Sequence, residues 1–460
     1  MSVDLPLSVV VLAAGQGTRM KSRLPKVLHT IAGKPLLEHV IEDALRLEAA
    51  DIHVVFGHGG AQVREALAAY DLQWVEQKEQ RGTGHAVEQA LPAIPDNHLV
   101  LLLYGDVPLI TVPTLQRLIA AAQGDALALL TAELADPSGY GRIVRDAAGR
   151  VQCIVEQKDA TEDQLAIHEI NTGMLAVKAD RLKQWIARLD DNNAQGEFYL
   201  TDIVGFAVAD GVTVNTVYPD EQCEIEGVNN KRQLAELERA FQWRQARQLM
   251  EEGLTLRDPA RFDLRGTLSI GQDVIIDCNV LIEGEVALGD EVYIGPNTVL
   301  KNVHIDAGTR VHTNCVLEDS VVGKRCEIGP YARLRPQSEL ADRVKVGNFV
   351  EIKKSQIATG SKVNHLSYVG DTTMGANVNV GAGTITCNYD GVYKHQTVIG
   401  DNVFIGSDTQ LVAPVTVAEG ATIGAGSTIT RDVPAETLTL SRAQQVTVEE
   451  WQRPKKADER

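Results

Sequence analysis

The second half of the chain carries an apolar repeat with a period of six residues. This period fits neither the 3.6-residue turn of an α-helix nor the two-residue alternation of a half-buried strand. It is typical of a parallel β-helix, in which each six residues supply a short strand and a corner, and stacked coils bury a ladder of aliphatic side chains. The repeat runs through three uninterrupted sets: Ile270, Ile276, Ile282, Leu288, Ile294 and Leu300; Val322, Ile328, Leu334, Leu340, Val346 and Ile352; and Ile399, Ile405, Leu411, Val417, Ile423 and Ile429.

One segment breaks the six-residue rhythm. Val380 and Ile399 are nineteen residues apart, and the stretch GAGTITCNYDGVYKHQT lies between them. We therefore expect a loop to be extruded from the coil at this point. Loops on repeat scaffolds commonly carry function.

The first half of the chain alternates strand-like and helix-like segments. This alternation predicts βαβ units and a largely parallel sheet, with ligands at the carboxyl ends of the strands. Amphipathic stretches at 35–48 and 61–70 are the clearest helix candidates. The strand-like segments are 8–13, 52–56, 72–75, 98–104, 126–133 and 151–155.

A run of good helix formers separates the two halves. It places Leu234, Leu237, Phe241 and Leu249 near one helical face and ends at Gly253. The sequence thus predicts three parts: an α/β domain at 1–228, a connecting helix at 229–253, and a β-helix with a C-terminal tail at 254–460.

A glycine-rich loop, LAAGQGTRM, follows the first predicted strand at residues 12–20. It matches neither the dinucleotide fingerprint nor the P-loop. Gly15 and Gly17 nevertheless allow backbone N–H groups to approach an anion, and Arg19 and Lys26 supply nearby cations. By itself such a loop is more often an ordinary strand-to-helix turn than a phosphate site.

Composition narrows the classes of partner. The formal charge of −18, from 44 basic and 62 acidic residues, argues against a general nucleic-acid or anionic-membrane binder, so a phosphate ligand must be met by local cations. The six cysteines include no Cys-x-x-Cys pair and are expected to be free thiols of a reducing compartment. The N-terminus lacks the basic start of a signal peptide, and no apolar run reaches the length of a membrane span. We expect a cytoplasmic protein.

Asp106 and Asn229 are the candidate metal ligands. Both offer hard oxygen atoms, which Mg²⁺ prefers when substrate phosphates and water complete its shell. Helix capping is the alternative, because Asp106 could cap a helix that starts near Thr111 and Asn229 could cap the connecting helix. Spacing alone leaves both interpretations open.

Taken together, the two halves resemble a family over essentially the whole chain: the bacterial bifunctional enzymes of UDP-N-acetylglucosamine synthesis. These enzymes combine a glucosamine-1-phosphate N-acetyltransferase with an N-acetylglucosamine-1-phosphate uridyltransferase. LAAGQGTRM with the following LPKVL resembles the signature of sugar nucleotidyltransferases, and YGDVPL, EGVNN, NHLSYVGD and CNYDG extend the match. The resemblance implies a Rossmann-like nucleotidyltransferase domain, a left-handed β-helix, Mg²⁺, the co-substrates UTP and acetyl-CoA, and a homotrimer.

For uridylyl transfer, the resemblance implies a nucleotide site, a sugar site and a metal site. The metal ligands are Asp106 and Asn229. The nucleotide site comprises Leu12, Ala13, Ala14, Gly15, Arg19, Lys26, Gln77, Gly82 and Thr83. The sugar site comprises Tyr104, Gly105, Asp106, Gly141, Glu156, Asn171, Thr172, Tyr199 and Asn229.

For acetyl transfer, the resemblance implies that His365 is the general base, a role for which imidazole needs no large pKa shift. Asn388 would orient either His365 or the substrate amine. The sugar phosphate would be held by Arg335, Lys353, Tyr368, Asn379 and Lys394. Acetyl-CoA would lie along Ala382, Asn388, Tyr389, Ser407, Ala425 and Arg442.

Two other functions share this layout. One is a nucleotide-sugar pyrophosphorylase with a non-catalytic β-helix, such as the ADP-glucose or GDP-mannose enzymes, which should lack His365, Lys353 and the CNYDG loop together. The other is a nucleotidyltransferase-like scaffold subunit of a translation factor, which would tolerate decay of the phosphate loop. The sequence retains all of these features, so we expect acetylation of glucosamine-1-phosphate followed by uridylyl transfer to N-acetylglucosamine-1-phosphate, with release of pyrophosphate.

Overall fold

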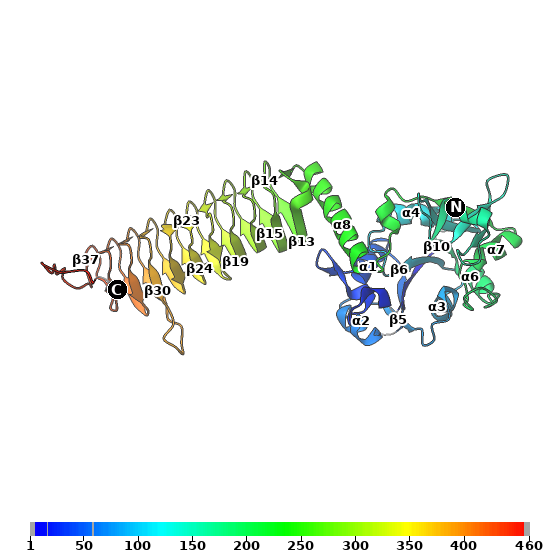
Figure 1. The fold of residues 1–460 in the computed structure, drawn as a ribbon, viewed down its shortest axis with the longest axis horizontal. Coiled ribbons are helices and arrows are strands. Elements are labelled where there is room, and N and C mark those ends of the chain that lie inside the picture. Colours follow the sequence, from blue (N-terminus) through cyan, green and yellow to red (C-terminus); the bar gives the residue numbers. More distant parts are fainter. Residues whose placement is uncertain (1–4, 16, 58, 455–460) are drawn as a thin grey trace, which may run out of the picture. The chain divides into compact units, whose positions relative to one another are not determined.

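The computed structural model describes residues 5–15, 17–57 and 59–454 (Figure 1). The chain divides into two compact units, Met1–Phe241 and Gln242–Arg460. This division falls inside helix α8 (Lys231–Glu251), so that each unit includes part of the helix.

The first unit is built on a nine-stranded mixed sheet in the order β11-β7-β10-β6-β1-β4-β5, with β8 attached to β10 and β9 attached to β8. The neighbours β6, β1, β4 and β5 are parallel, as predicted. The six predicted strands are present within a residue or two of their expected bounds. Three strands were missed, and one of them, β10, runs antiparallel to both of its central neighbours. The strands are β1 (Leu7–Ala13), β4 (Asp51–Phe56), β5 (Gln73–Glu76), β6 (Leu99–Tyr104), β7 (Ala126–Glu133), β8 (Arg142–Arg145), β9 (Val151–Val155), β10 (Glu169–Lys178) and β11 (Thr213–Val217).

Helices cover both faces of this sheet, which explains why its central strands are apolar throughout. In β1, Val9 and Val11 join one buried core while Val10 and Leu12 join the other. The first core includes side chains of α1 and α4, and the second includes those of α3, α6 and α7. The helices are α1 (Leu36–Arg46), α2 (Gly60–Ala66), α3 (Thr83–Ala90), α4 (Val112–Ala121), α5 (Glu162–Leu165), α6 (Ala179–Ile186) and α7 (Asp202–Ala209).

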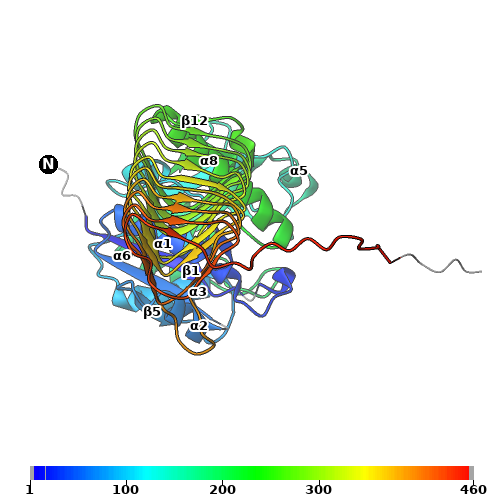
Figure 2. The same ribbon diagram turned by 90° about the vertical axis from the view of Figure 1, so that its left-hand side faces the viewer.

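The second unit is a parallel β-helix whose coils stack behind one another (Figure 2). An eleven-stranded sheet forms one side. Its strands are β12 (Thr255–Leu256), β14 (Ile275–Ile276), β16 (Tyr293–Ile294), β18 (Arg310–Val311), β20 (Glu327–Ile328), β23 (Lys345–Asn348), β26 (Lys362–His365), β29 (Asn379–Val380), β32 (Phe404–Ile405), β35 (Thr422–Ile423) and β37 (Leu438–Thr439).

A second sheet of fifteen strands completes the coil. It starts with four long strands and divides after β19 into two series. The long strands are β13 (Phe262–Ile270), β15 (Val280–Leu288), β17 (Val299–Ile305) and β19 (Val316–Val322). One series is β21 (Arg333–Leu334), β24 (Glu351–Lys353), β27 (Tyr368–Gly370), β30 (Ile385–Cys387), β33 (Gln410–Val412) and β36 (Thr428–Ile429); the other is β22 (Ser338–Leu340), β25 (Ser355–Ile357), β28 (Thr372–Met374), β31 (Thr397–Ile399) and β34 (Val415–Val417).

Side chains of the six-residue repeat stack from coil to coil inside the β-helix. Ile276 pairs with Ile294, which pairs with Val311, and all three are fully buried. Many corners are turned by residues with left-handed backbone, among them Asn279 and Asn297 with φ of 57°, a conformation that asparagine tolerates well. The predicted order of an α/β domain followed by a parallel β-helix is confirmed, and the coil is consistent with the left-handed form.

The interruption of the repeat is also confirmed. Residues 388–396 leave the coil between β30 and β31 and return to it. Tyr389 and Lys394 bridge the two limbs of this loop, while Val392 and Tyr393 at its tip are strongly exposed. Among the described residues, no helix has both the length and the apolar content that a membrane crossing requires.

Candidate active sites

A cavity of about 400 Å³ lies in the first unit at the carboxyl ends of β1 and β6. All of the predicted nucleotide residues except Arg19 line it, together with Tyr104 and Asp106 of the predicted sugar and metal sites. Sequence reasoning missed the remaining lining residues, which are Val27, Gln80, Ala86 and Glu197.

Close backbone contacts fix the wall of this cavity at the start of α3. Gly82 has φ of 109°, and a Cβ atom added there would lie 2.7 Å from the carbonyl oxygen of Phe198. Glycine is therefore required both for the conformation and for the space. Opposite this wall, the Gln80 side chain donates a hydrogen bond of 2.6 Å to the carbonyl oxygen of Ala14 in the phosphate loop. Gln80 thus ties the loop to a segment far away in the sequence.

The two predicted phosphate cations contact the two predicted metal ligands. The Lys26 ammonium group forms an ion pair with the Asp106 carboxylate. The Arg19 guanidinium donates to the side-chain oxygen of Asn229 over 2.9 Å. Each of the two predicted metal ligands is therefore paired with one of the two predicted phosphate cations.

The capping interpretation of the metal ligands is wrong. Thr111 caps α4 with its own hydroxyl group, which accepts from the backbone N–H of Thr114. At the start of α8, the side-chain oxygen of Asn230 accepts from the backbone N–H of Gln233 over 3.0 Å. Neither Asp106 nor Asn229 performs this role.

A smaller cavity of about 100 Å³ adjoins the first and shares Thr83 and Tyr104 with it. Glu156 and Asn171 of the predicted sugar site line this cavity. Burial raises the pKa of Glu156, although a hydrogen bond of 3.0 Å from the Thr201 hydroxyl group opposes that effect. Burial is also the main reason that the pKa of Tyr104 is raised.

A bulge in β10 aims Asn171 at the smaller cavity. The register of β10 against β7 shifts between Asn171 and Leu175. Within the bulge Gly173 has φ of 86°, and a Cβ atom there would lie 2.6 Å from the Tyr104 hydroxyl oxygen. The Thr172 hydroxyl group turns away and donates to the carbonyl oxygen of Leu130 over 2.8 Å.

Several predicted sugar residues thus lie outside both cavities. Thr172 is bonded to the sheet backbone, and the Tyr199 hydroxyl group donates to Asp159 over 3.3 Å. Gly141 and Gly105 are explained by packing, since a Cβ atom on either would lie 2.9 Å from a neighbouring apolar side chain. For these residues the structure supports a role in shaping the site.

In the second unit, His365 ends β26 and its side chain is exposed. Its Nδ1 atom lies 2.9 Å from the side-chain oxygen of Asn348, its register neighbour on the preceding coil. With that oxygen accepting, Nδ1 carries the proton and Nε2 is free to act as a base. The described side-chain contact of the imidazole is with Asn348, whereas the Asn388 side chain contacts Tyr368 and Asp371.

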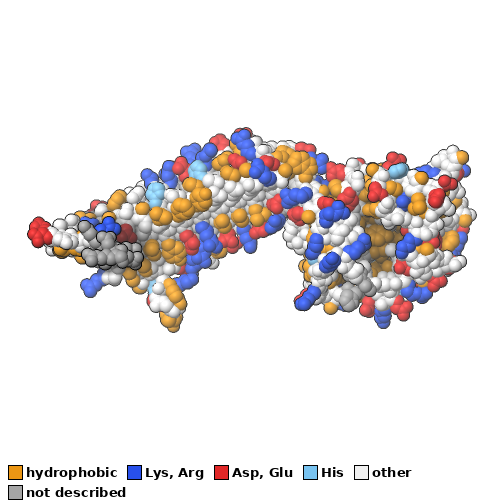
Figure 3. Space-filling model, viewed as in Figure 1, with side chains coloured by type: hydrophobic (Ala, Val, Ile, Leu, Met, Phe, Trp, Pro, Cys, Tyr) orange, Lys and Arg blue, Asp and Glu red, His pale blue; other side chains and the backbone are white. Residues whose placement is uncertain are grey.

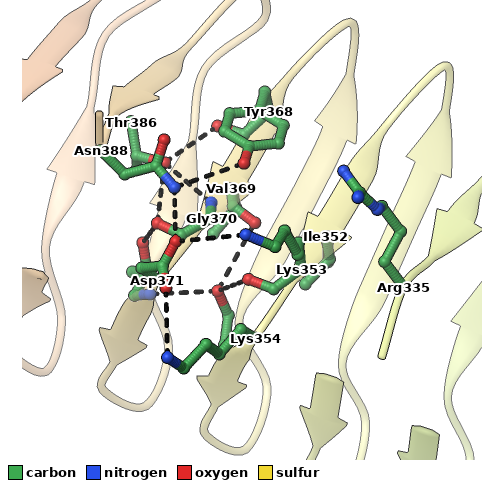
Figure 4. Close-up of polar contacts among 12 residues, drawn as sticks. Arg335, Ile352, Lys353, Lys354, Tyr368, Val369, Gly370, Asp371, Thr386 and Asn388 are labelled. Carbon is green, nitrogen blue, oxygen red and sulfur yellow. Dashed lines mark hydrogen bonds and ion pairs between the residues drawn. The ribbon is translucent and has the colours of Figure 1, made fainter. Parts of the chain in front are cut away.

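A group of charged side chains surrounds Asp371, whose side chain is only 9% exposed (Figure 4). The Nζ atoms of Lys353 and Lys354 lie 3.6 and 3.7 Å from its carboxylate oxygens. The Asn388 side-chain amide donates to the same carboxylate over 2.5 Å. Lys394 follows in the extruded loop, and the Lys353 ammonium group lowers the pKa of Lys394. We call Lys353, Lys354, Lys394 and Asp371 the lysine cluster.

The other predicted sugar-phosphate residues lie on neighbouring strands. Arg335 is already paired, because its guanidinium donates to the Glu351 carboxylate over 2.9 Å. The Tyr368 hydroxyl oxygen lies 3.4 Å from the Asn388 amide nitrogen. Asn379 begins β29, on a different sheet from Tyr368.

Three of the predicted acetyl-CoA positions follow one another along the coil axis. The carbonyl oxygen of Ala382 accepts from the backbone N–H of Asp408, next to Ser407 on the following coil. The carbonyl oxygen of Ser407 accepts in the same way from the backbone N–H of Gly426, next to Ala425. Arg442 donates to the carbonyl oxygen of Ala425 over 2.8 Å. These small side chains leave a line of accessible backbone, whereas Tyr389 lies in the extruded loop and donates to Gly391.

Comparison with known proteins identifies both units. Three protein-family models match the sequence. The MobA-like NTP transferase domain matches residues 9–164, the GMPPB C-terminal domain matches residues 264–348, and the bacterial transferase hexapeptide matches residues 396–431. The bifunctional protein GlmU of Methylococcus capsulatus is 60% identical, with 97% of each chain covered. GlmU proteins of Marinobacter nauticus and Aromatoleum aromaticum are 58% and 59% identical, over 98% of this chain and all of theirs.

This chain belongs to the GlmU family. The predicted membership is confirmed, and as a GlmU protein the chain is a bifunctional transferase. An NTP-transferase domain and a transferase hexapeptide domain lie in separate units. The scaffold-subunit and non-catalytic β-helix alternatives are not supported by these relatives.

Proposed function

We propose that this GlmU protein acetylates glucosamine-1-phosphate with acetyl-CoA in its β-helix and then transfers UMP from UTP to the product in its α/β unit. The observation that carries the proposal is the presence of two separate sets of reactive groups. The α/β unit holds a glycine-rich loop with two cations, and the β-helix holds an exposed histidine and the lysine cluster.

In acetyl transfer, the substrate amine attacks the thioester carbonyl of acetyl-CoA, a C–N bond forms, and the C–S bond breaks to release CoA. His365 takes the proton from the amine through Nε2, the nitrogen that Asn348 leaves free. Lys353 and Lys394 bind the sugar phosphate, and Ala382, Ser407 and Ala425 give the coenzyme access to the backbone.

In uridylyl transfer, a phosphate oxygen of N-acetylglucosamine-1-phosphate attacks the α-phosphorus of UTP. The bond to the β-phosphate breaks, and pyrophosphate leaves. Arg19 and Lys26 offset the charge that develops on the phosphates. Bound Mg²⁺ would supply a further positive charge to the phosphates, and the oxygen atoms of Asp106 and Asn229 suit that ion. Glu156 and Asn171 would bind the sugar from the smaller cavity.

Separate assays test the two reactions. The protein is incubated with glucosamine-1-phosphate, acetyl-CoA, UTP and Mg²⁺, and the release of CoA and of pyrophosphate is followed independently. We expect both products, with UDP-N-acetylglucosamine as the end product. His365→Ala should lower CoA release by about 10²- to 10⁴-fold, the usual contribution of a general base, and should leave uridylyl transfer to supplied N-acetylglucosamine-1-phosphate unchanged. Equal loss of both reactions would contradict the assignment.

We also propose that the protein is a homotrimer assembled through its β-helix. Hydrophobic side chains gather in patches along the coil surface (Figure 3). Tyr331 and Phe349 stack with ring centroids 5.2 Å apart, and both are more than half exposed, as is Leu366 on the next coil. An exposed apolar row of this kind favours burial against another copy. Sedimentation or light scattering should give three times the chain mass, and a monomer at micromolar concentration would refute the proposal. The cytoplasmic location and the absence of nucleic-acid and membrane partners stay predictions.

A further inference from the structure

Asp371 is a largely buried carboxylate with partners from both neighbouring coils. Its oxygens lie near the ammonium groups of Lys353 and Lys354, and it accepts the 2.5 Å hydrogen bond from Asn388. Figure 4 shows these side chains converging on it from either side. Burying a charge is costly unless the charge is paired and hydrogen-bonded. The contacts therefore satisfy the buried carboxylate, and the carboxylate in return fixes the positions of its partners.

The charges of the lysine cluster match a phosphate monoester. One carboxylate among three ammonium groups leaves two positive charges. Arg335 adds little to this excess, because Glu351 pairs with it. A phosphate monoester carries a charge of about −1.5 to −2 at pH 7. Asp371 thus lowers the net positive charge of the cluster to a value that balances the negative charge of the phosphate. It also holds the lysines together despite their mutual repulsion.

Asp371 also sets the orientation of the Asn388 side chain. Since the carboxylate only accepts hydrogen bonds, the amide nitrogen of Asn388 must point toward it. The amide nitrogen also lies near the Tyr368 hydroxyl oxygen. Among the described residues, no group donates to the opposite atom, the Asn388 side-chain oxygen. That oxygen is left to accept an N–H of a substrate amine.

We propose that Asp371 is a positioning residue of the acetyltransferase site, acting through Lys353 on the sugar phosphate and through Asn388 on the amine. The inference rests on the proposed acetyl transfer. It gives the carboxylate no part in bond making or breaking. Its effect is to keep two binding groups in place and to keep the neighbouring lysines charged.

The test is Asp371→Asn, which preserves shape and removes the charge. We expect kcat/KM for glucosamine-1-phosphate to fall by about 10- to 100-fold, with a raised KM. Lys353 lowers the pKa of Lys394, whereas Asp371 and Tyr368 oppose that effect. Without the Asp371 carboxylate the Lys394 ammonium group loses its proton more easily, so KM should begin to rise at a lower pH.

Asp342→Asn is the matched control. Asp342 is an aspartate at another coil corner, where it accepts from the backbone N–H of Lys324 and contacts no lysine side chain of the cluster. This variant should keep wild-type kinetics. A double-mutant cycle adds a second readout: in a Lys353→Met background, Asp371→Asn should have a much smaller effect on KM, because the group through which it acts is gone.

The outcomes separate the two proposals. If the wild-type protein releases no CoA, the proposed acetyl transfer fails and this inference fails with it. If the wild type is active and Asp371→Asn keeps its KM and pH profile, only the inference is overturned. Should Asp371→Asn lose its fold, Asp371→Glu takes its place, because it keeps the negative charge. If KM in Asp371→Glu rises at the same alkaline pH as in the wild type, the role of the charge is supported; if KM rises at a lower pH, that role is refuted.

Discussion

The Nδ1 atom of His365 and the side-chain oxygen of Asn348 lie 2.9 Å apart, on neighbouring coils and 17 residues apart in the sequence. The contact holds the imidazole in one orientation and leaves Nε2 as the basic nitrogen. With His365 as the proposed base, we expect Asn348 to orient it.

The first prediction concerns this pair. Asn348→Ala should lower kcat for acetyl transfer by roughly 10-fold because the base loses its orientation. Asn348→Asp should act differently: a carboxylate beside Nδ1 favours the charged imidazolium, so the acid limb of the kcat profile should move to higher pH. Asn402→Asp, at an exposed corner of another coil, is the control. An unmoved acid limb in Asn348→Asp would refute the contact.

A second prediction tests the glycine at the start of α3. Gly82→Ala should lower uridylyl transfer on the order of 10²-fold, because φ of 109° and the Phe198 carbonyl oxygen both exclude a Cβ atom and the cavity wall must move. The control is Gly205→Ala in α7, where nothing lies within 4 Å of an added Cβ atom. That change should raise stability by up to about 1 kcal/mol and leave activity unchanged. Pyrophosphate release and thermal melting measure the two effects.

A third prediction concerns the metal ligands. Asp106→Asn should slow uridylyl transfer by ~100-fold or more, since it removes a negative charge from the proposed Mg²⁺ site. The stabilisation of the phosphates by that ion matters most in the transition state. Excess EDTA should abolish this reaction and spare CoA release. Asp125→Asn, which breaks a surface ion pair with Arg181 in the same unit, should leave both reactions near wild type. Full uridylyl activity in EDTA would exclude the metal.

A fourth prediction follows from the first turns of α8. Leu237 is 1% exposed and packs in a small core with Met20, Ile31 and Leu109. Since Met20 directly follows Arg19 in the phosphate loop, this core supports the nucleotide site. A fragment of residues 1–251 should fold and retain uridylyl transfer, whereas a fragment of residues 1–230 should lose its fold and this activity. Circular dichroism and pyrophosphate release compare the two.

In the full-length chain, Leu237→Ala provides the matching point variant. It should destabilise the first unit by about 2–5 kcal/mol, the usual cost of truncating a buried leucine. Acetyl transfer should continue, because the β-helix has its own core. If the 1–230 fragment proves as active as the longer one, α8 has no part in the nucleotide site.

In the α/β unit, some strands could be predicted from the sequence and others could not. Strands such as β6 were predicted because burial on both faces leaves an unbroken apolar run. β10 was missed because the bulge at Asn171–Gly173 interrupts its pattern with polar residues and glycine. The same bulge turns Asn171 toward the cavity and Thr172 away from it, a distinction that requires the backbone geometry.

What the sequence determined by itself is the scaffold: a period of six residues can bury its aliphatic side chains only by stacking coils, so the β-helix and its extruded loop follow from spacing alone. The tertiary structure decided which polar side chains meet. Lys354, Asp371 and Asn388 recur at 17-residue intervals, as do Asn348 and His365, but coil length is not constant: Asn279 and Asn297 lie 18 residues apart, and Val380 pairs with Ile405 across the extruded loop, 25 residues later. Polar side chains carry no periodic signal of their own, and their contacts depend on the register of neighbouring coils and on the corner conformations, which only the folded chain fixes.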